Sequence, residues 1–269
     1  MSKGEQPGLG EAAGSHAGQR VMVTAGARGI GRAIALAVRD AGARVEVCDL
    51  ETEALEAFAA EAPGVGTTSA DVSDEAAVER FFDQALGRLG GLDVLVNNAG
   101  IAGPTAPVEE VAFADWRSTL AVNLDGCFLC SRKAAPILKE AGQGAIINLS
   151  STAGLFGYPL RTPYASAKWA VIGFTKSLAA ELGPHGVRVN AICPGPVEGD
   201  RMVRVIAAQA AARGVEAATI RQQYEESVSM RRFVTVEDIA ATALFLCSEA
   251  GAAISGQALP VDGHTESLT

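Results

Sequence analysis

The sequence of 269 residues has few histidines, a deficit of positive charge and no long apolar run, and each shortage excludes a class of protein. The three histidines, at positions 16, 185 and 264, are too scattered to give a metal-ligand spacing. Lys and Arg number 22 against 31 Asp and Glu, and the net charge of −9 argues against nucleic acid or an acidic membrane as the main partner. No apolar run approaches the length of a membrane span.

Cysteine is scarce as well, with five residues in an odd, scattered set. Their apolar surroundings predict free thiols in a reducing compartment, so we expect a cytoplasmic protein. Cys127 and Cys130 have the spacing C-x-x-C, but no second pair or nearby histidine completes a metal site. We therefore interpret both as buried core residues and expect no metal.

The order of sequence patterns predicts an α/β fold. Residues 1–19 are Gly-rich and polar, which predicts a flexible tail rather than a secretory signal. From residue 20 to 269, short β-branched runs alternate with helical patterns, as in a doubly wound parallel sheet flanked by helices on both faces. The expected strands are Arg20–Ala25, Arg44–Cys48, a weak strand ending at Ala70, Leu92–Val96, Gly144–Leu149, Val187–Cys193 and Ala258–Val261. The expected helices are Gly29–Ala41, Glu51–Ala60, Asp74–Arg88 with Asp74 as N-cap, Phe113–Glu140, Pro163–Leu182 and Asp238–Ser248.

The segment 198–230 breaks this alternation. It is polar, rich in Ala and Arg, and follows the breaker Pro194-Gly195-Pro196. Ligands of such sheets bind at the carboxyl ends of the strands, so we interpret the segment as a mobile lid over that site. A structural insertion is the alternative.

A glycine-rich turn, Thr24-Ala25-Gly26-Ala27-Arg28-Gly29-Ile30-Gly31, lies between the first expected strand and the first expected helix. Small residues let the backbone approach a pyrophosphate, and the N–H groups of a helix N-terminus favour the anion. A turn in this position predicts a dinucleotide site.

Charged residues near the turn bear on the choice of cofactor. Asp49, at the end of the second strand, is placed to accept from both ribose hydroxyls of NAD and to repel a 2′-phosphate. Arg28 favours NADP instead, because a cation in the turn suits the 2′-phosphate of that cofactor. We give Asp49 the greater weight and predict NAD, with Asp71 placed to contact adenine.

Tyr164 and Lys168 lie four residues apart, thirteen residues after Ser151. On a helix, residues at this spacing share one face. A nearby ammonium favours the phenolate, and a tyrosine with a lowered pKa exchanges a proton with an alcohol near neutral pH. Ser151 follows an apolar run and is a candidate for holding the substrate oxygen. An isolated pair of this kind is more typical of a solvated helix surface, so the other motifs decide whether this pair is catalytic.

Together these motifs resemble the short-chain dehydrogenase/reductase family, in particular its 3-oxoacyl carrier-protein reductases and its hydroxy-acid and secondary-alcohol dehydrogenases. The glycine turn, Asn97-Asn98-Ala99-Gly100, Asn123, Ser151, the Tyr164/Lys168 pair and Pro194-Gly195 occur in the family's order, between residues 19 and 263. The resemblance implies a single Rossmann-type domain, a nicotinamide cofactor, a small alcohol or ketone as substrate, and a homotetramer, with a dimer as the next choice.

The resemblance also implies a role for each matching residue. Tyr164 looks like the general acid/base, and Lys168 like the group that lowers its pKa and binds the nicotinamide ribose. Ser151 is similar to the family's substrate-orienting serine, and Asn123 to the asparagine that holds a water in the proton relay. The implied cofactor-binding residues are Thr24, Gly26, Arg28, Gly29, Ile30, Gly31, Asp49, Leu50, Asp71, Val72, Asn98, Ala99, Gly100, Tyr164, Lys168, Pro194, Gly195 and Val197.

Two departures from the family pattern lie near the cofactor. Ala25 stands where the family has glycine, which predicts a slightly altered loop with binding retained. Glu198-Gly199 stand where the family often has a threonine that touches the cofactor.

Three arginines are candidates for binding the substrate. Arg161 occupies a position where some family members that act on hydroxy acids bind a carboxylate or sulfonate. A guanidinium suits such a group because it binds two oxygens at once. Arg201 and Arg204, in the expected lid, are candidates for a second clamp, and Phe156 for the pocket wall. The alternative is that all three arginines are solvated surface charges.

We therefore predict an NAD-dependent oxidoreductase that interconverts a secondary alcohol and a ketone, or an alcohol and an aldehyde. One hypothesis is that the substrate carries an anionic group. An NADP-linked 3-oxoacyl thioester reductase is the alternative within this class. A nucleotide-sensing binding protein with little turnover is the alternative outside it. The complete set of catalytic residues favours the enzyme, since a sensor needs only the cofactor half.

Overall fold

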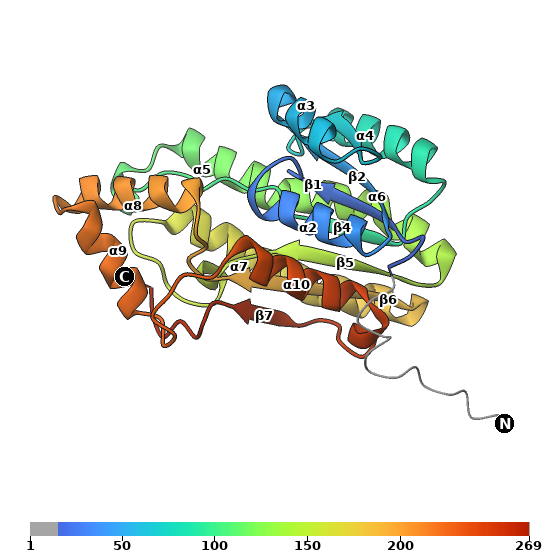
Figure 1. Cartoon of the computed structure of the whole chain (residues 1–269). Helices are drawn as coiled ribbons and strands as arrows, with labels where there is room; N and C mark the ends of the chain where they lie inside the picture. The colour runs from blue at the N-terminus through green and yellow to red at the C-terminus, as the bar shows by residue number, and fades with distance from the viewer. Residues whose placement is uncertain (1–15, 269) are drawn as a thin grey trace.

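The computed structural model describes residues 16–268, which form one seven-stranded sheet of order β3-β2-β1-β4-β5-β6-β7 with every neighbouring pair parallel (Figure 1). The order reverses between β1 and β4, so the carboxyl ends of these two strands flank the switch point where such sheets bind ligands. The strands are β1 (Arg20–Thr24), β2 (Arg44–Asp49), β3 (Gly66–Ser69), β4 (Val94–Asn97), β5 (Gly144–Leu149), β6 (Val187–Pro194) and β7 (Ala258–Val261).

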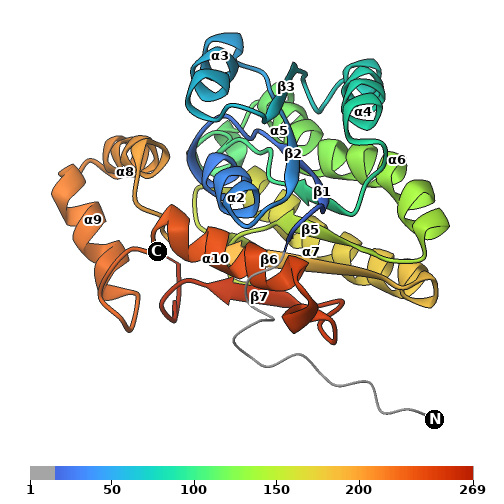
Figure 2. The same ribbon diagram turned by 45° about the vertical axis from the view of Figure 1, so that its right-hand side comes forward.

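Helices cover both faces of the sheet (Figure 2). One face carries α2 (Gly29–Asp40), α3 (Thr52–Glu61) and α10 (Val236–Cys247). The other carries α4 (Glu75–Leu89), α6 (Gly126–Ala141) and α7 (Thr162–Leu182), with α5 (Phe113–Leu120) leading into α6. Helices α8 (Asp200–Arg213) and α9 (Ala217–Glu226) lie beyond one end of the sheet. Short 3₁₀ turns span Val108–Glu110, Thr152–Gly154, Gly183–His185 and Glu249–Gly251.

The apolar strands are explained by burial on both faces of the sheet. Val21, Met22 and Val23 of β1 are all fully buried. Successive side chains of a strand point to opposite faces, so Val21 and Val23 pack with α2 and α10 while Met22 packs with α4 and α6. The predicted fold class, a doubly wound parallel sheet between two layers of helices, is confirmed.

Two segments contain structure that the sequence patterns do not predict. The helix expected over 113–140 is continuous but contains a π-helical turn, Ala121–Asp125, between α5 and α6. Such a turn adds one residue to a helical repeat, which apolar periodicity does not reveal. The segment 198–230, interpreted as a lid with no elements assigned to it, contains α8 and α9, whose few apolar residues gather into one small cluster that includes Ile206 and Ile220.

Residues 16–19 of the predicted tail are packed against the domain instead of being free. The backbone N–H of His16 donates to Ala41 (3.2 Å), and that of Gly18 donates to Gly42 (3.1 Å). Gln19 Nε2 donates to the carbonyl of Cys247 (3.2 Å). These backbone groups find partners in the α2–β2 connection, which local composition does not show. The rest of the predicted tail, residues 1–15, lies outside the described residues.

All five cysteines are free and buried, which confirms their assignment to the core. Burial raises the pKa of Cys127 to about 12, so this thiol of the C-x-x-C pair stays protonated. Among residues 16–268, no cluster of His, Cys, Asp and Glu is arranged to hold a metal ion. No helix in the same range is both long and apolar enough to cross a membrane.

The glycine turn contains a strained residue whose substitution is a test of the fold. Ala25 has φ of +49°, a left-handed conformation that costs a non-glycine residue about 1–2 kcal/mol. Glycine removes this strain but adds roughly 0.4–1 kcal/mol of chain entropy to the unfolded state. We expect Ala25→Gly to raise the free energy of unfolding by about 0.5–1 kcal/mol, measured by urea denaturation.

The matched control is Ala33→Gly, in the interior of α2. It is expected to lower the free energy of unfolding by about 1 kcal/mol, because glycine disfavours a helix interior. A loss of stability in both variants would contradict the strain at Ala25.

Candidate active site

Hydrogen bonds join the carboxyl ends of β1 and β4, where the cofactor is expected. The Thr24 hydroxyl accepts from the backbone N–H groups of Asn98 and Ala99, each at 3.0 Å. The Asn98 amide donates to the carbonyls of Thr24 and Ala25, also at 3.0 Å. The glycine turn is therefore braced by the strand next to it, and the Asn98 amide donors are used within the protein.

The turn has the shape that a pyrophosphate requires. Gly29, the first residue of α2, has φ of +54°, and a Cβ placed there would meet no atom within 4 Å. The start of α2 therefore presents open backbone. At Gly31 a Cβ would lie 2.2 Å from the Ala25 carbonyl oxygen, so α2 packs too closely on the turn for any larger residue. An open helix N-terminus on a tightly packed turn fits a dinucleotide phosphate.

Charged side chains surround the ribose end of this turn. Asp49 ends β2, and one carboxylate oxygen accepts from the Ala27 N–H (3.2 Å). Arg28 is exposed and pairs with Glu51 at 2.7 Å. The positive charge of Arg28 is therefore neutralised by Glu51.

The other residues predicted for the cofactor follow the same edge of the sheet. Asp71 accepts from the backbone N–H and hydroxyl of Ser73 (2.9 and 2.7 Å), which fixes the turn after β3. Leu50 is exposed after β2, and Val72 is buried against α6. Beyond β6, the Gly195 N–H donates to Val261 (3.0 Å) and Val197 pairs with Val234.

Tyr164 and Lys168 lie on one turn of α7, with the Lys168 ammonium 5.7 Å from the centre of the Tyr164 ring. Lys168 is buried and donates to the Leu149 carbonyl at 2.8 Å. Burial raises the pKa of Tyr164, but the charges of Lys168, Arg201 and Arg161, together with the Ser151 hydroxyl, outweigh burial and lower it. Burial also lowers the pKa of Lys168, which the phenolate partly opposes. A phenol of lowered pKa beside an ammonium is suited to proton transfer near neutral pH.

Ser151 follows β5 and caps a short 3₁₀ turn, where its oxygen accepts from the Ala153 N–H (3.1 Å). Its neighbour Ser150, which sequence reasoning missed, is buried and donates to the Lys168 carbonyl (2.8 Å). A Cβ at Gly154 would lie 2.6 Å from the Ser150 oxygen, so glycine is required there. Ser150 thus fixes α7 against the end of β5, while Ser151 faces Tyr164.

Asn123 occupies the π-helical turn and is buried. Its amide donates to the carbonyls of Thr119 (2.8 Å) and Ile101 (3.0 Å). Its side-chain oxygen has no hydrogen-bond partner among the described residues. A Cβ at Gly100 would lie 2.6 Å from that oxygen and 3.3 Å from the Lys168 ammonium, so the two groups face the same small space. A buried acceptor beside an ammonium suits a water that joins them.

The three candidate arginines occupy different environments. Arg161 is only 2% exposed, so the interpretation as a solvated surface charge is wrong for this residue. Its guanidinium lies between two tyrosine rings, 5.4 Å from the centres of Tyr158 and Tyr164, and donates to the Ala102 carbonyl (2.7 Å). The position beside Tyr164 depends on the loop before α7, which the sequence pattern does not describe.

Arg201 and Arg204 lie on α8, and both are exposed. Arg201 lies 5.9 Å from the centre of the Tyr164 ring and donates to the Gly100 carbonyl (3.1 Å), so the structure brings it to the site. Phe156 is half-buried in the loop after Ser151, and its carbonyl accepts from the Trp169 indole (3.5 Å).

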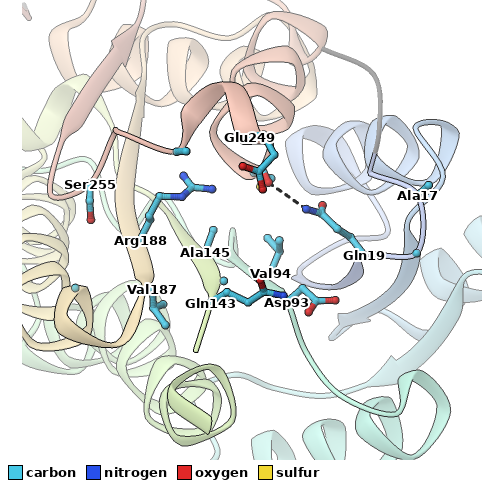
Figure 3. Close-up of a pocket in the computed structure, with 16 residues that line it drawn as sticks. Ala17, Gln19, Asp93, Val94, Gln143, Ala145, Val187, Arg188, Glu249 and Ser255 are labelled. Atoms are coloured by element: carbon cyan, nitrogen blue, oxygen red, sulfur yellow. Dashed lines mark hydrogen bonds between the residues drawn. The ribbon is translucent and has the colours of Figure 1, made fainter. Parts of the chain in front are cut away.

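A separate cavity of about 570 Å³ lies at the amino ends of β4, β5 and β6, away from these residues (Figure 3). Arg188 donates there to the carbonyl of Leu246, in the last turn of α10, and to that of Gly251, in the 3₁₀ turn that follows. Gln19 donates to the Cys247 carbonyl. The polar side chains of this cavity therefore brace the end of α10, and the residues predicted for catalysis lie at the opposite, carboxyl ends of the strands.

Comparison with known proteins agrees with this geometry. A family model described as enoyl-(acyl carrier protein) reductase matches residues 24–264. D-threitol dehydrogenase of Mycolicibacterium smegmatis is 38% identical over 250 residues, which cover 91% of this chain and 92% of that protein. A 2-dehydro-3-deoxy-L-rhamnonate dehydrogenase (NAD(+)) of a Sphingomonas species is 36% identical, covering 88% of this chain and 91% of the relative.

A solved structure of NAD+-bound xylitol dehydrogenase superposes with a TM-score of 0.88 at 31% identity, over 92% of this chain and 99% of that chain. Fold, site and relatives together define the class of protein, a nucleotide-dependent oxidoreductase on a single parallel sheet. The chain belongs to the short-chain dehydrogenase/reductase family.

Proposed function

We propose that this oxidoreductase is an NAD-linked dehydrogenase of small secondary alcohols, with Tyr164 as the acid/base. The observation that carries the proposal is the pairing of half-buried Tyr164 with buried Lys168 beside Ser151, at the carboxyl ends of the strands, where the glycine turn also lies. When bound, NAD supplies the hydride acceptor. The names of relatives that act on threitol, xylitol and a deoxy-rhamnonate support an alcohol as substrate.

The proton follows a path through the chain's own residues. In oxidation, the Ser151 hydroxyl donates to the substrate oxygen and holds it beside Tyr164. The Tyr164 phenolate removes the hydroxyl proton, and the Lys168 ammonium stabilises the phenolate before the transfer. The space between Lys168 and the unpaired oxygen of Asn123 then holds a water through which the proton leaves. Reduction uses the same groups in the reverse order.

The preference for NAD rests on the acids at the glycine turn. Asp49 lies beside the turn, where its carboxylate accepts from the Ala27 N–H (3.2 Å), and Glu51 pairs with Arg28 at 2.7 Å. A 2′-phosphate would meet a carboxylate at Asp49 and would have to compete with Glu51 for the Arg28 guanidinium. This arrangement also argues against the NADP-linked thioester reductase. The names of an NAD(+) dehydrogenase relative and an NAD+-bound structural neighbour support the same choice.

The proposal is tested by a dehydrogenase assay of the purified chain with NAD and with NADP, over secondary alcohols, sugars and hydroxy acids. We expect turnover with NAD, and we expect Asp49→Ala to lower the NAD preference by roughly tenfold or more, since it removes a charged hydrogen-bond acceptor. Glu51→Gln, which frees Arg28, should raise kcat/KM for NADP alone. An unchanged preference in both variants would contradict the assignment of the acids.

The finer proposal is that the substrate carries an anionic group. Arg161 is 2% exposed, and its Nε is buried without a hydrogen-bond partner among the described residues. Within residues 16–268, no carboxylate pairs with Arg161 or Arg201. A buried cation without a counter-charge is unfavourable, so a substrate anion that pairs with it gains free energy. Three cations around Tyr164 make the site attractive to such a group.

A panel of neutral alcohols and hydroxy acids with matched carbon skeletons tests this finer proposal. We expect a lower KM for the acid, and we expect Arg161→Gln to raise that KM by roughly tenfold to a hundredfold, since a charged hydrogen bond contributes about 1.5–3 kcal/mol. Arg161→Lys should retain part of the preference because it keeps the charge. Equal KM values for acid and neutral alcohol in the parent protein would refute an anionic substrate and leave the dehydrogenase assignment intact.

We also propose a homotetramer in the cytoplasm. Large apolar side chains are exposed on α5, α6 and α7, where Phe113 is 76% exposed, Phe128 44% and Trp169 52%. An apolar area of this kind is typical of a contact between protomers. The five free cysteines support a reducing compartment.

Light scattering of the purified chain should therefore give about four times the protomer mass of 27.6 kDa. Phe128→Glu should lower that mass, because it places a charge in the contact. The matched change Leu50→Glu, at an exposed apolar residue outside these helices, should leave the mass unchanged. A monomeric parent protein would refute the assembly.

A further inference from the structure

All three tyrosines of the chain meet beside the active site, although they come from separate segments. Tyr164 lies in α7, Tyr158 in the loop before it, and Tyr224 in α9. The Arg161 guanidinium lies 5.4 Å from the ring centres of both Tyr158 and Tyr164. The catalytic phenol is thus linked to a second tyrosine, which in turn contacts the lid.

Tyr158, Gln209 and Tyr224 form a closed ring of hydrogen bonds, which we call the latch ring. Gln209 Nε2 donates to the Tyr158 hydroxyl (3.1 Å), and the Tyr224 hydroxyl donates to Gln209 Oε1 (3.0 Å). The two phenol oxygens are also hydrogen-bonded to each other. Because Tyr224 uses its proton on Gln209, Tyr158 donates to Tyr224, and each group donates once and accepts once.

Two of the three members of the latch ring are buried, and Tyr158 is half-buried. Gln209 is 2% exposed and Tyr224 is 3% exposed, so water does not replace a lost bond without opening the lid. Burial raises the pKa of both Tyr158 and Tyr224, which keeps their protons in place. The ring therefore stays intact over the pH range in which Tyr164 loses its proton.

Helix α8 connects the latch ring to the catalytic tyrosine. Gln209 lies eight residues after Arg201 in this helix of 14 residues. Arg201 reaches the site from the first turn, 5.9 Å from the centre of the Tyr164 ring and 3.1 Å from the Gly100 carbonyl oxygen. A helix moves largely as one body, so fixing Gln209 fixes Arg201. The apolar cluster shared by α8, α9 and Tyr158 strengthens the same contact.

The groups that face Tyr164 come from four directions. Lys168 lies on its own helix, Arg161 lies before that helix, Arg201 comes from α8, and Ser151 follows β5. Tyr158 is the remaining titratable neighbour and is protonated. Arg201 is the one cation of this set that the lid brings to the site.

We propose that the latch ring of Tyr158, Gln209 and Tyr224 holds α8 closed over the active site, and that α8 thereby presents Arg201 to Tyr164 as a positioning residue for the phenolate. The inference rests on the proposed function, because it assigns how the base of that site is prepared. Closing the lid then adds the Arg201 cation to those of Lys168 and Arg161 beside Tyr164, and opening the lid removes it. The base becomes strongest when the substrate is enclosed.

The test measures kcat for the oxidation of a neutral secondary alcohol at saturating concentration with NAD. The pH runs from about 6 to about 10, which covers the range in which a tyrosine of lowered pKa loses its proton. The variants are Tyr224→Phe, which removes only the latch hydroxyl, Arg201→Gln and the double variant. Loss of a facing cation raises the pKa of the phenol, so less phenolate is present at neutral pH. We expect each variant to lower kcat at pH 7 by roughly tenfold and to recover activity at high pH.

The double variant distinguishes a latch from two independent effects. If Tyr224 acts through Arg201, the double variant should lose no more kcat at pH 7 than Arg201→Gln does. Arg201→Lys should restore part of the loss, because it returns the charge. The control Gln222→Ala, at an exposed position on α9, should keep the parent profile. A Tyr224→Phe variant with the parent pH profile would overturn the proposal, whatever its stability.

A second measurement does not depend on turnover. With three tyrosines in the chain, ultraviolet absorbance follows their ionisation directly, and Tyr164→Phe identifies the signal of the catalytic phenol. Both Tyr224→Phe and Arg201→Gln should move that signal to higher pH. If the parent protein oxidises no alcohol, the proposed function fails, and this titration still decides the latch. An unmoved Tyr164 signal in both variants would refute it.

Discussion

The burial of the Lys168 ammonium is the constraint on which the structure at the carboxyl ends of the strands depends. A charge that is 3% exposed requires polar partners, and the chain surrounds it with the Leu149 carbonyl, the Tyr164 phenol and the space beside Asn123. These groups come from β5, α7 and the π-helical turn, so three elements meet around the ammonium.

The same constraint explains several residues that do no chemistry. Ser150 fixes the backbone of Lys168 to the end of β5, and Gly154 leaves room for that contact. Gly100 leaves room between Asn123 and the ammonium. Around this centre, Arg161 and Arg201 add positive charge without a carboxylate partner in residues 16–268. The result is a field that favours a phenolate and, by our proposal, an anionic substrate.

The sheet and the main helices followed from the sequence because burial on both faces leaves a strong local signal. Strands such as 21–23 are continuously apolar, and Asp74 caps α4 as its position predicts, accepting from the Ala76 N–H at 2.9 Å. The π-helical turn at Asn123 left no such signal, since one extra residue barely changes an apolar repeat. Helices α8 and α9 were missed because their buried faces are small and cover each other rather than the sheet.

The sequence by itself determined the family's motif order, the phosphate turn and the pairing of Tyr164 with Lys168, because these depend on neighbours along the chain. Only the tertiary structure decided that Arg161 is buried between two tyrosines, that Glu51 neutralises Arg28, and that Arg201 reaches the Tyr164 ring. Each of these contacts joins groups whose separation is set by loops and by the placement of α8. The charge on a side chain is written in the sequence, but its effect depends on burial and on what lies opposite, which the folded chain alone fixes.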